Sequence, residues 1–285
     1  MAKGPLILEI CRGPEACRKV VVRPGQVIRV GRTDRAEFCV ARDEHLSGLH
    51  FALDWTSVRP RLIDLGSATG ILLNSERVLE AFVKHGDWIR AGATDLMVQD
   101  AEVVRRGGEG EMVPIRAAAL ERLDDELEPL FGVFDAARSD RIRELMRGAE
   151  ERYRSLYDGP QADALAEAAP YLVELPRVSA LLELLVCEGW TERWGVYLTS
   201  KLPFDEVRRH LRRFLMVEDE ETAERMYFRF YDPAVLRVFL PTCTMRQGMT
   251  FFGEIGRFYL EGEDGEVLTF EAPAKAPAGT QPAAE

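Results

Sequence analysis

The stretch Asp64-Leu65-Gly66-Ser67-Ala68-Thr69-Gly70 decides the fold of the first hundred residues. Its two glycines permit tight backbone turns, and its small hydroxyl side chains bond readily to neighbouring backbone. Short apolar segments flank it, at residues 61–63 and 71–73. The pattern predicts two strands joined by a tight loop that presents polar side chains.

Similar short apolar segments recur from residue 5 to residue 100, and turn signals such as Pro24-Gly25, Gly86-Asp87 and Gly92 separate them. We predict strands at residues 6–10, 19–22, 27–30, 38–40, 50–55, 61–63, 71–73, 88–90 and 95–98. Nine short strands without a good helix predict an all-β sandwich over residues 1–104.

The pattern changes after residue 104. Residues 105–110 are polar and rich in glycine, and residues 117–128 look helical, so we predict a linker with a short helix over 105–127. Helical and strand patterns then mix over residues 128–271, which predicts an α/β or α+β domain. The expected strands are 130–134, 196–199, 226–231 and a hairpin of 256–261 with 266–270, and the expected helices are 139–149, 177–188, 203–214 and 234–240. Residues 272–285, rich in Ala and Pro, are expected to be disordered.

Length and charge agree with two units. A chain of 285 residues favours two domains over one. The net charge of −11 argues against a general partner among nucleic acids or membrane surfaces, since both are polyanionic. Residues 1–100 hold 14 basic and 13 acidic side chains, whereas the remainder holds 23 and 35. Units with such different balances are expected to have different partners.

Five scattered cysteines do not form the pattern of a disulfide framework. We expect free thiols in a reducing cytoplasm, although Cys11 and Cys17 flank a turn and could face each other. The first residues lack the apolar core of a secretory signal, and the longest apolar run, 178–186, is about half the length that spans a bilayer. We therefore expect a cytoplasmic protein.

Polar side chains from three turns could meet at one end of the sandwich, where loops cluster. Arg32 offers a planar fork of donors that suits phosphate or carboxylate. Ser47, Ser67 and Thr69 offer small hydroxyl donors. Such a set favours an anion-binding site.

The order of these pieces resembles the forkhead-associated (FHA) domain, a family that binds phosphothreonine. The matching residues are Gly31-Arg32, Ser47-Gly48-Leu49-His50, residues 64–70, Asn74 and the run from Gly86 to Gly92. The resemblance covers about residues 5–100 and implies that Arg32 and Ser47 hold a phosphopeptide, with Ser67 and Thr69 beside them. The residues assigned to the structure of the loops are Gly31, His50, Asp64, Gly66, Gly70 and Asn74.

Three positions depart from the family pattern. The residue after the binding serine is Gly48, the phosphate-contacting threonine falls at Ala68, and the asparagine that grips the peptide backbone falls at Thr69. A charge-assisted hydrogen bond contributes roughly 1.5–3 kcal/mol, so Arg32 alone does not replace the missing contacts. Two hypotheses stay open: a phosphothreonine-binding domain, or a docking module that has kept the fold and lost this ligand.

The second half resembles the effector chaperone, or adaptor, family of bacterial type VI secretion, long known as a domain of unknown function. The resemblance runs from about residue 130 to residue 270. It rests on residues 134–138, 169–173, 210–213, 228–233 and 251–253, of which Arg-Phe-Tyr-Asp-Pro at 229–233 is the most distinctive. It implies a non-enzymatic protein that binds a secreted effector and hands it to a VgrG-like spike protein. The residues assigned to partner binding are Arg208, Arg212, Arg229, Tyr231, Asp232 and Phe252.

Each of these assignments has a structural alternative. Arginines on the helix 203–214 could be its solvated face or a docking face for an acidic segment. Asp232-Pro233 is a sound helix start, with Asp as N-cap and Pro at the first position. Most aromatic residues of this half are expected in the core.

Motifs for chemistry are missing from the sequence. It has no phosphate-binding glycine loop, no nucleophile elbow and no Cys/His set at zinc-ligand spacing. We therefore expect no enzymatic activity, no cofactor and no metal, although a distant pair such as Cys243 with His210 stays open. The alternative to the adaptor is a phosphothreonine-binding signalling or scaffold protein of a bacterial kinase pathway.

Overall fold

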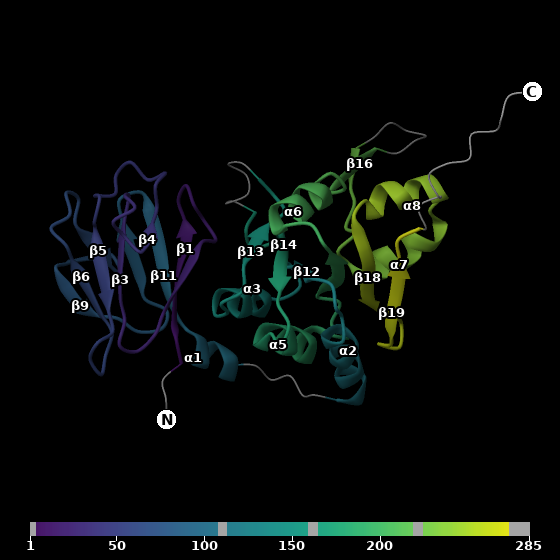
Figure 1. Cartoon of the computed structure of the whole chain (residues 1–285), viewed down its shortest axis with the longest axis horizontal. Helices are drawn as coiled ribbons and strands as arrows, with labels where there is room; N and C mark the ends of the chain where they lie inside the picture. The colour runs from purple at the N-terminus through teal and green to yellow at the C-terminus, as the bar shows by residue number, and fades with distance from the viewer. Residues whose placement is uncertain (1–3, 108–112, 159–164, 219–224, 274–285) are drawn as a thin grey trace, which may run out of the picture.

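The computed structural model describes residues 4–107, 113–158, 165–218 and 225–273. Figure 1 shows two folded parts side by side, a sandwich of strands built by the first hundred residues and a sheet with helices built by the rest. A short helix, α1 (Ala101–Arg106), follows the last strand of the sandwich. Within the described segments, no helix has both the length and the apolar character that crossing a bilayer requires.

The sandwich consists of two sheets with the strand orders β2-β1-β11-β10-β7-β8 and β4-β3-β5-β6-β9. Neighbouring strands are antiparallel apart from the parallel pair β3 and β4. The strands are β1 (Leu6–Arg12), β2 (Lys19–Val22), β3 (Val27–Gly31), β4 (Phe38–Cys39), β5 (Phe51–Asp54), β6 (Arg61–Asp64), β7 (Ile71–Leu73), β8 (Glu76–Val78), β9 (Glu80–Phe82), β10 (Trp88–Ala91) and β11 (Thr94–Asp100). The predicted all-β sandwich is confirmed.

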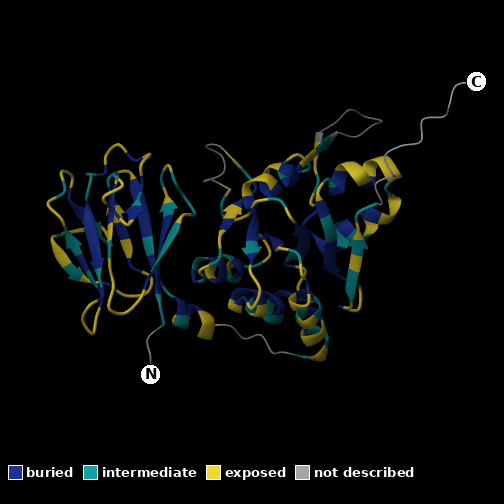
Figure 2. Ribbon diagram, in the orientation of Figure 1, coloured by how far each residue is buried: buried dark blue, intermediate teal, exposed yellow. Residues whose placement is uncertain are grey.

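Alternating side chains of both sheets fill the space between them. Leu8 and Ile10 of β1 meet Phe51 and Leu53 of β5 in one continuous apolar core. Figure 2 shows this core as a buried interior with exposed loops at both ends. Because the strands are fixed from inside, the loops at the ends are free to carry polar side chains.

Strands β8 and β9 were not predicted. Each is three residues long, lies at the edge of its sheet and is mostly exposed. Such strands bury little apolar surface, so their sequence lacks the alternation that marks a half-buried strand.

The second part is built on a six-stranded antiparallel sheet with the order β13-β14-β12-β15-β18-β19. Its strands are β12 (Leu130–Asp135), β13 (Tyr153–Ser155), β14 (Pro170–Leu175), β15 (Gly195–Ser200), β18 (Ile255–Glu261) and β19 (Val267–Glu271), and a separate hairpin pairs β16 (Met216–Glu218) with β17 (Arg225–Tyr227). The helices are α2 (Pro114–Asp124), α3 (Asp140–Arg147), α5 (Ala180–Gly189), α6 (Phe204–Arg212), α7 (Pro233–Thr242) and α8 (Met245–Phe252). A mixed α/β fold is confirmed.

The central strand β12 is buried along its whole length because helices cover both faces of the sheet. Leu130 and Phe134 join a core with side chains of α2, α3 and α5. Phe131 and Val133 point to the opposite face and join a core with side chains of α6, α7 and α8. The alternation of a strand thus serves two cores, which explains why its sequence is a continuous apolar run.

Two predicted helix starts are confirmed. The Ser139 hydroxyl accepts the backbone N–H of Arg141 at the start of α3. The Asp232 carboxylate accepts the backbone N–H of Ala234 at the start of α7, and Pro233 occupies the first helical position. The strand expected at 226–231 was wrong in its extent, because β17 ends at Tyr227. The strands β13 and β14 and the helix α8 were not predicted.

The predicted linker with a short helix, 105–127, begins within α1 and contains α2. Asp100 caps α1, and Val104 on this helix is buried in the core that contains α3 and α5. A Cβ on Gly148 would lie 2.5 Å from a methyl carbon of Val104, so a glycine is needed where α1 approaches α3. Residues 108–112 of the predicted linker and the predicted tail beyond residue 273 lie outside the described residues. The domain boundaries themselves stay a prediction.

Strands β1 and β2 of the sandwich contact the second part directly. The Lys19 ammonium donates to the carbonyl oxygens of Met146 and Ala149 at the end of α3, the latter at 2.6 Å. The Tyr153 hydroxyl on β13 donates to the buried Glu9 carboxylate on β1. Desolvation lowers the pKa of Lys19 to about 8 and raises the pKa of Glu9, which shows how far water is excluded from this interface.

The Glu9 carboxylate is incompletely paired. Its Oε2 atom is buried without a hydrogen bond, and the nearest cation, Arg147 Nε, is 3.9 Å away. Burial raises the pKa of Glu9 above its value in the unfolded chain. The protein is therefore more stable at acidic pH, where Glu9 is neutral, and this contribution to the free energy of unfolding is lost as the pH rises through the folded pKa. The Tyr153 hydroxyl offsets part of that loss, since it favours the ionised form.

Tyr153→Phe tests this interface. Loss of a hydrogen bond to an ionised group costs about 1.5–3 kcal/mol, and loss of one to a neutral group costs about half of that. We expect the urea midpoint of Tyr153→Phe to fall well below that of the unmodified protein at pH 8 and to approach it at pH 4.5. Tyr227→Phe, at an exposed position, is the control. A difference that does not change with pH would show that Glu9 is not the partner that matters.

Candidate functional site

Gly31 brings the first polar loop of the sandwich against the second. A Cβ on Gly31 would lie 2.3 Å from the carbonyl oxygen of Gly48, so only glycine permits this approach. The backbone N–H of Arg32 then donates to the carbonyl of Ser47 at 2.9 Å. The two residues predicted to hold a phosphopeptide are therefore adjacent.

The Arg32 guanidinium is available to a ligand. The side chain is exposed, and its one contact is a long bond from Nη1 to the carbonyl oxygen of Glu44 at 3.4 Å. It forms no ion pair with any residue that the structure describes. Its fork of donors thus points out of the sandwich without a carboxylate to neutralise it.

The buried His50 side chain joins the two loops by hydrogen bonds. Its buried ring accepts the backbone N–H of Ser47 at Nδ1, at 3.0 Å, so the hydrogen is on Nε2 and donates to the carbonyl of Gly70 at 3.1 Å. The Ser47 hydroxyl in turn accepts the backbone N–H of Ala68 at 3.0 Å. One imidazole and one hydroxyl therefore hold the two loops at a fixed separation.

The loop 64–70 is shaped by its own carboxylate. Asp64 accepts the backbone N–H of Ser67 at 2.8 Å and its hydroxyl at 3.2 Å. Gly66 and Gly70 adopt φ of +76° and +73°, a region that disfavours other residues. Thr69 is exposed at the top of the loop. Asp64 thus already engages the Ser67 hydroxyl, whereas Thr69 faces solvent.

Asn74 lies outside the ligand loops and fixes a hairpin. It has φ of +50°, its Oδ1 accepts the Trp88 N–H at 2.9 Å, and its Nδ2 donates to Asp87 at 2.9 Å. Asn74 is thus a turn residue whose side chain is bonded to Trp88, the first residue of β10, and to Asp87 just before it.

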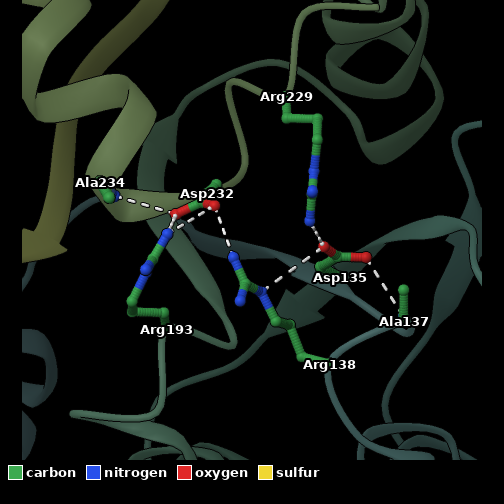
Figure 3. Close-up of polar contacts among 7 residues, drawn as sticks. All are labelled: Asp135, Ala137, Arg138, Arg193, Arg229, Asp232 and Ala234. Carbon is green, nitrogen blue, oxygen red and sulfur yellow. Dashed lines mark hydrogen bonds and ion pairs between the residues drawn. The ribbon is translucent and has the colours of Figure 1, made fainter.

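The second part carries a cluster of ion pairs at one end of its sheet (Figure 3). Asp135, at the end of β12, pairs with Arg229. Asp232 pairs with Arg138 at 2.6 Å and with Arg193 at 2.9 Å. Three loops, those that follow β12, α5 and β17, thus meet through two buried carboxylates and three arginines.

Comparison with known families assigns both parts. Residues 28–92 match the FHA domain, and residues 130–248 match a domain of unknown function, DUF4123. The chain carries an FHA domain and a DUF4123 domain. FHA domains are interaction modules and not enzymes.

Individual relatives cover the FHA part. The FHA domain-containing protein At4g14490 of Arabidopsis thaliana is 26% identical over 179 residues, which cover 57% of this chain and 46% of that protein, so the chain spans about half of this relative. The FHA domain of an Arabidopsis thaliana hypothetical protein is 31% identical and covers 35% of this chain and 88% of that chain, with a TM-score of 0.33. The Rv1747 FHA-1 domain of Mycobacterium tuberculosis is 26% identical and covers 34% and 99%, with a TM-score of 0.29.

Sequence reasoning missed one cation beside the FHA loops. The Arg77 guanidinium on β8 lies so close to Gly70 that a Cβ there would be 2.5 Å from Nη2. The side chain is exposed and forms no ion pair with a described residue. It was missed because β8 itself was not predicted.

Arg208 and Arg212 of the DUF4123 domain both bond to backbone carbonyls in and after β13. Arg208 is 8% exposed, and its guanidinium donates to the carbonyls of Ser155 at 2.7 Å and Tyr157 at 3.1 Å. Arg212 donates to the carbonyl of Leu156 at 2.8 Å. Both arginines therefore hold the segment that follows β13, so the idea that they line one solvated helix face was wrong for Arg208.

Tyr231 and Phe252 are also interior. Both are buried in the aromatic core beneath α7 and α8, and the Phe252 ring packs against Phe258 with centroids 5.2 Å apart. Asp232 is buried as well. Among the six residues assigned to partner binding, Arg229 is the one with a largely exposed side chain.

The described residues offer no group of histidine, cysteine or acidic side chains that could hold a metal ion. All five cysteines are free, including Cys11 and Cys17. The His210 ring bonds to the carbonyl of Phe251 at 2.7 Å, and the Cys243 thiol bonds to that of Phe239. Each of these two side chains has a structural partner of its own.

Gly31→Ala tests the close approach that sets up the FHA loops. The added methyl overlaps backbone, which costs about 1–3 kcal/mol. We expect a lower melting temperature of the FHA domain, measured by thermal denaturation. Gly48→Ala is the matched control on the other side of the same contact, because its Cβ would meet Thr33 at an ordinary 3.4 Å. Equal effects of the two substitutions would contradict this account.

Proposed function

We propose that the chain is a non-enzymatic adaptor of a bacterial type VI secretion system. The DUF4123 domain binds one secreted effector and promotes its loading onto a VgrG-like spike protein. The FHA domain provides a second docking point, for a protein that carries phosphothreonine. The observation that carries the proposal is the presence, in one chain, of an FHA domain and a DUF4123 domain whose distinctive Arg229–Pro233 run resembles effector adaptors.

The structure supports a binding role in two ways. In the FHA domain, Arg32 and Ser47 are adjacent, and the guanidinium is free of any described carboxylate. In the DUF4123 domain, the charged side chains at the end of the sheet pair with one another, and the arginines among them are partly exposed. Binding a protein surface needs no cofactor, in keeping with the lack of nucleotide motifs.

A signalling or scaffold protein is the second candidate. It is favoured by the intact pairing of Arg32 with Ser47, which would let the FHA domain bind the product of a kinase. Ala68 and Thr69 weigh against it, since neither supplies the contact that the family pattern has there.

Arg32→Ala tests phosphothreonine binding. We expect the unmodified protein to prefer phosphothreonine peptides over the same peptides without phosphate, and Arg32→Ala to lose that preference with an unchanged melting temperature, since the guanidinium makes a single long contact. Arg59→Ala, in the loop at the opposite end of β6, is the control. No preference in the unmodified protein would refute phosphothreonine binding, and a gain on Ala68→Thr with Thr69→Asn would then favour a module that has lost this ligand.

Deletion of the gene tests the adaptor role. We expect one effector to be retained in the cell while the secretion tube still fires, because an adaptor loads a particular cargo and does not build the tube. The full chain should co-purify with that effector without added nucleotide or metal, and it should restore export when reintroduced. Export of every effector at the wild-type level would refute the adaptor role and favour the signalling candidate.

A further inference from the structure

Three arginines of the DUF4123 domain form an outer layer over two buried carboxylates. Arg138, Arg193 and Arg229 come from separate loops and converge on Asp135 and Asp232 (Figure 3). The Asp135 side chain is 2% exposed, whereas that of Arg229 is 47% exposed. The acids are therefore enclosed, and the cations face solvent.

This layer presents donors only. Each guanidinium has five N–H donors and no acceptor. Arg193 and Arg229 use only Nη2 for the bonds to their carboxylates. Among the described residues, the remaining donors of these partly exposed side chains have no hydrogen-bond partner, so they can bond to an acceptor that approaches from outside.

The arginines are also held in place before a partner arrives. Arg193 is anchored by both oxygens of Asp232, at 3.0 and 2.9 Å. The loop that carries Arg193 is held by a further hydrogen bond, because the buried Glu261 carboxylate accepts the backbone N–H of Thr191 at 2.6 Å. A side chain that is already ordered loses less conformational entropy on binding, so such a layer binds more tightly than mobile surface arginines.

Exposed apolar side chains lie next to the layer. Tyr227 is the last residue of β17, two residues before Arg229, and it is 67% exposed. It pairs across the hairpin with Met216, which is also exposed. Tyrosine and arginine are the residues that most often dominate protein interfaces.

We propose that Arg138, Arg193, Arg229 and Tyr227 form a docking surface for an acidic segment of a partner protein. The occupant follows from charge, since a layer of donors attracts carboxylates and repels a basic segment. The whole chain has a net charge of −11, so most of its surface repels an acidic segment. Such a segment can bind only where cationic side chains face outward. The inference rests on the proposed function, because it names the face and the chemistry by which the adaptor half takes its partner.

The full chain and a defined probe test this surface. The probe is the fluorescein-labelled peptide Glu-Glu-Leu-Glu-Asp-Leu-Glu-Glu, and its neutral analogue has Gln and Asn in place of the acids. We expect the acidic peptide to bind at least about tenfold more tightly than the neutral one by fluorescence anisotropy, with an affinity that falls as salt increases.

Two variants leave the fold intact and remove the surface. Arg193→Gln keeps Asp232 paired with Arg138 and with the Ala234 N–H, and Tyr227→Ala changes an exposed side chain. Each should weaken binding of the acidic peptide by about tenfold. Tyr227→Ala should leave the melting temperature unchanged, whereas Arg193→Gln should lower it modestly, because Asp232 keeps one of its two arginine partners. Arg193→Lys should restore part of the affinity, because it keeps the charge. Arg209→Gln on α6 and Met245→Ala on α8, both exposed, are the controls and should bind as the unmodified chain does.

The outcomes separate this surface from the adaptor role. Equal binding of the two peptides, or an equal loss in Arg209→Gln, overturns the docking surface. Full restoration of effector export in the deletion strain by Arg193→Gln with Tyr227→Ala also overturns it while the adaptor role stands. If deletion of the gene affects no effector, the adaptor role fails, and a selective loss of acidic-peptide binding in these variants still supports the surface itself.

Discussion

The DUF4123 domain depends on one strand that must be buried on both faces. β12 lies between β14 and β15, and its alternate side chains enter two different cores. Such a strand has no polar side until it ends, and it ends on Asp135, which is also buried. A buried carboxylate needs a partner, and Arg229 supplies it from the turn before α7. The ion-pair cluster therefore lies where the central strand ends. Its partly exposed arginines are required because the strand ends on a buried carboxylate.

In the FHA domain, close contact between the backbones of two loops determines the arrangement of the site. Gly31 lies against the backbone of Gly48, and the Arg32 N–H bonds to the Ser47 carbonyl, so the two loops are joined through their backbones. His50 and Asp64 then fix the loop 64–70 by hydrogen bonds from below and from within. Arg32 and Thr69, two of the residues predicted to contact a ligand, remain exposed on this scaffold. The departures from the family pattern at Ala68 and Thr69 thus affect ligand contacts, whereas the supporting contacts are all present.

The sequence predicts best where a residue acts through its neighbours in the chain. The caps at Ser139 and Asp232, the turn glycines and the hairpin of β18 and β19 are local, so composition and spacing identify them. It predicts poorly where a residue acts through a distant partner. Arg208 fits the polar face of an amphipathic helix, yet Ser155 and Tyr157, about fifty residues away, take its guanidinium into the interior. The short exposed strands β8 and β9 leave almost no apolar pattern, and Arg77 was missed with them.

The least predictable feature is the contact between the two domains, because polar and glycine-rich composition at residues 105–110 suggests independence. Instead, the turn between β1 and β2 has contacts on both sides. Arg18 donates to the carbonyl of Cys39 at 2.7 Å, and the Cys39 thiol in turn bonds to the carbonyl of Arg32. On the other side, Cys17 packs against the core of the DUF4123 domain. Modules on a flexible linker bring two partners together only through an effective concentration that linker length sets. Domains that share a buried interface around Glu9 and Lys19 instead fix the direction of each binding face, so a partner on the FHA loops and a partner on the arginine layer would be presented in one defined arrangement.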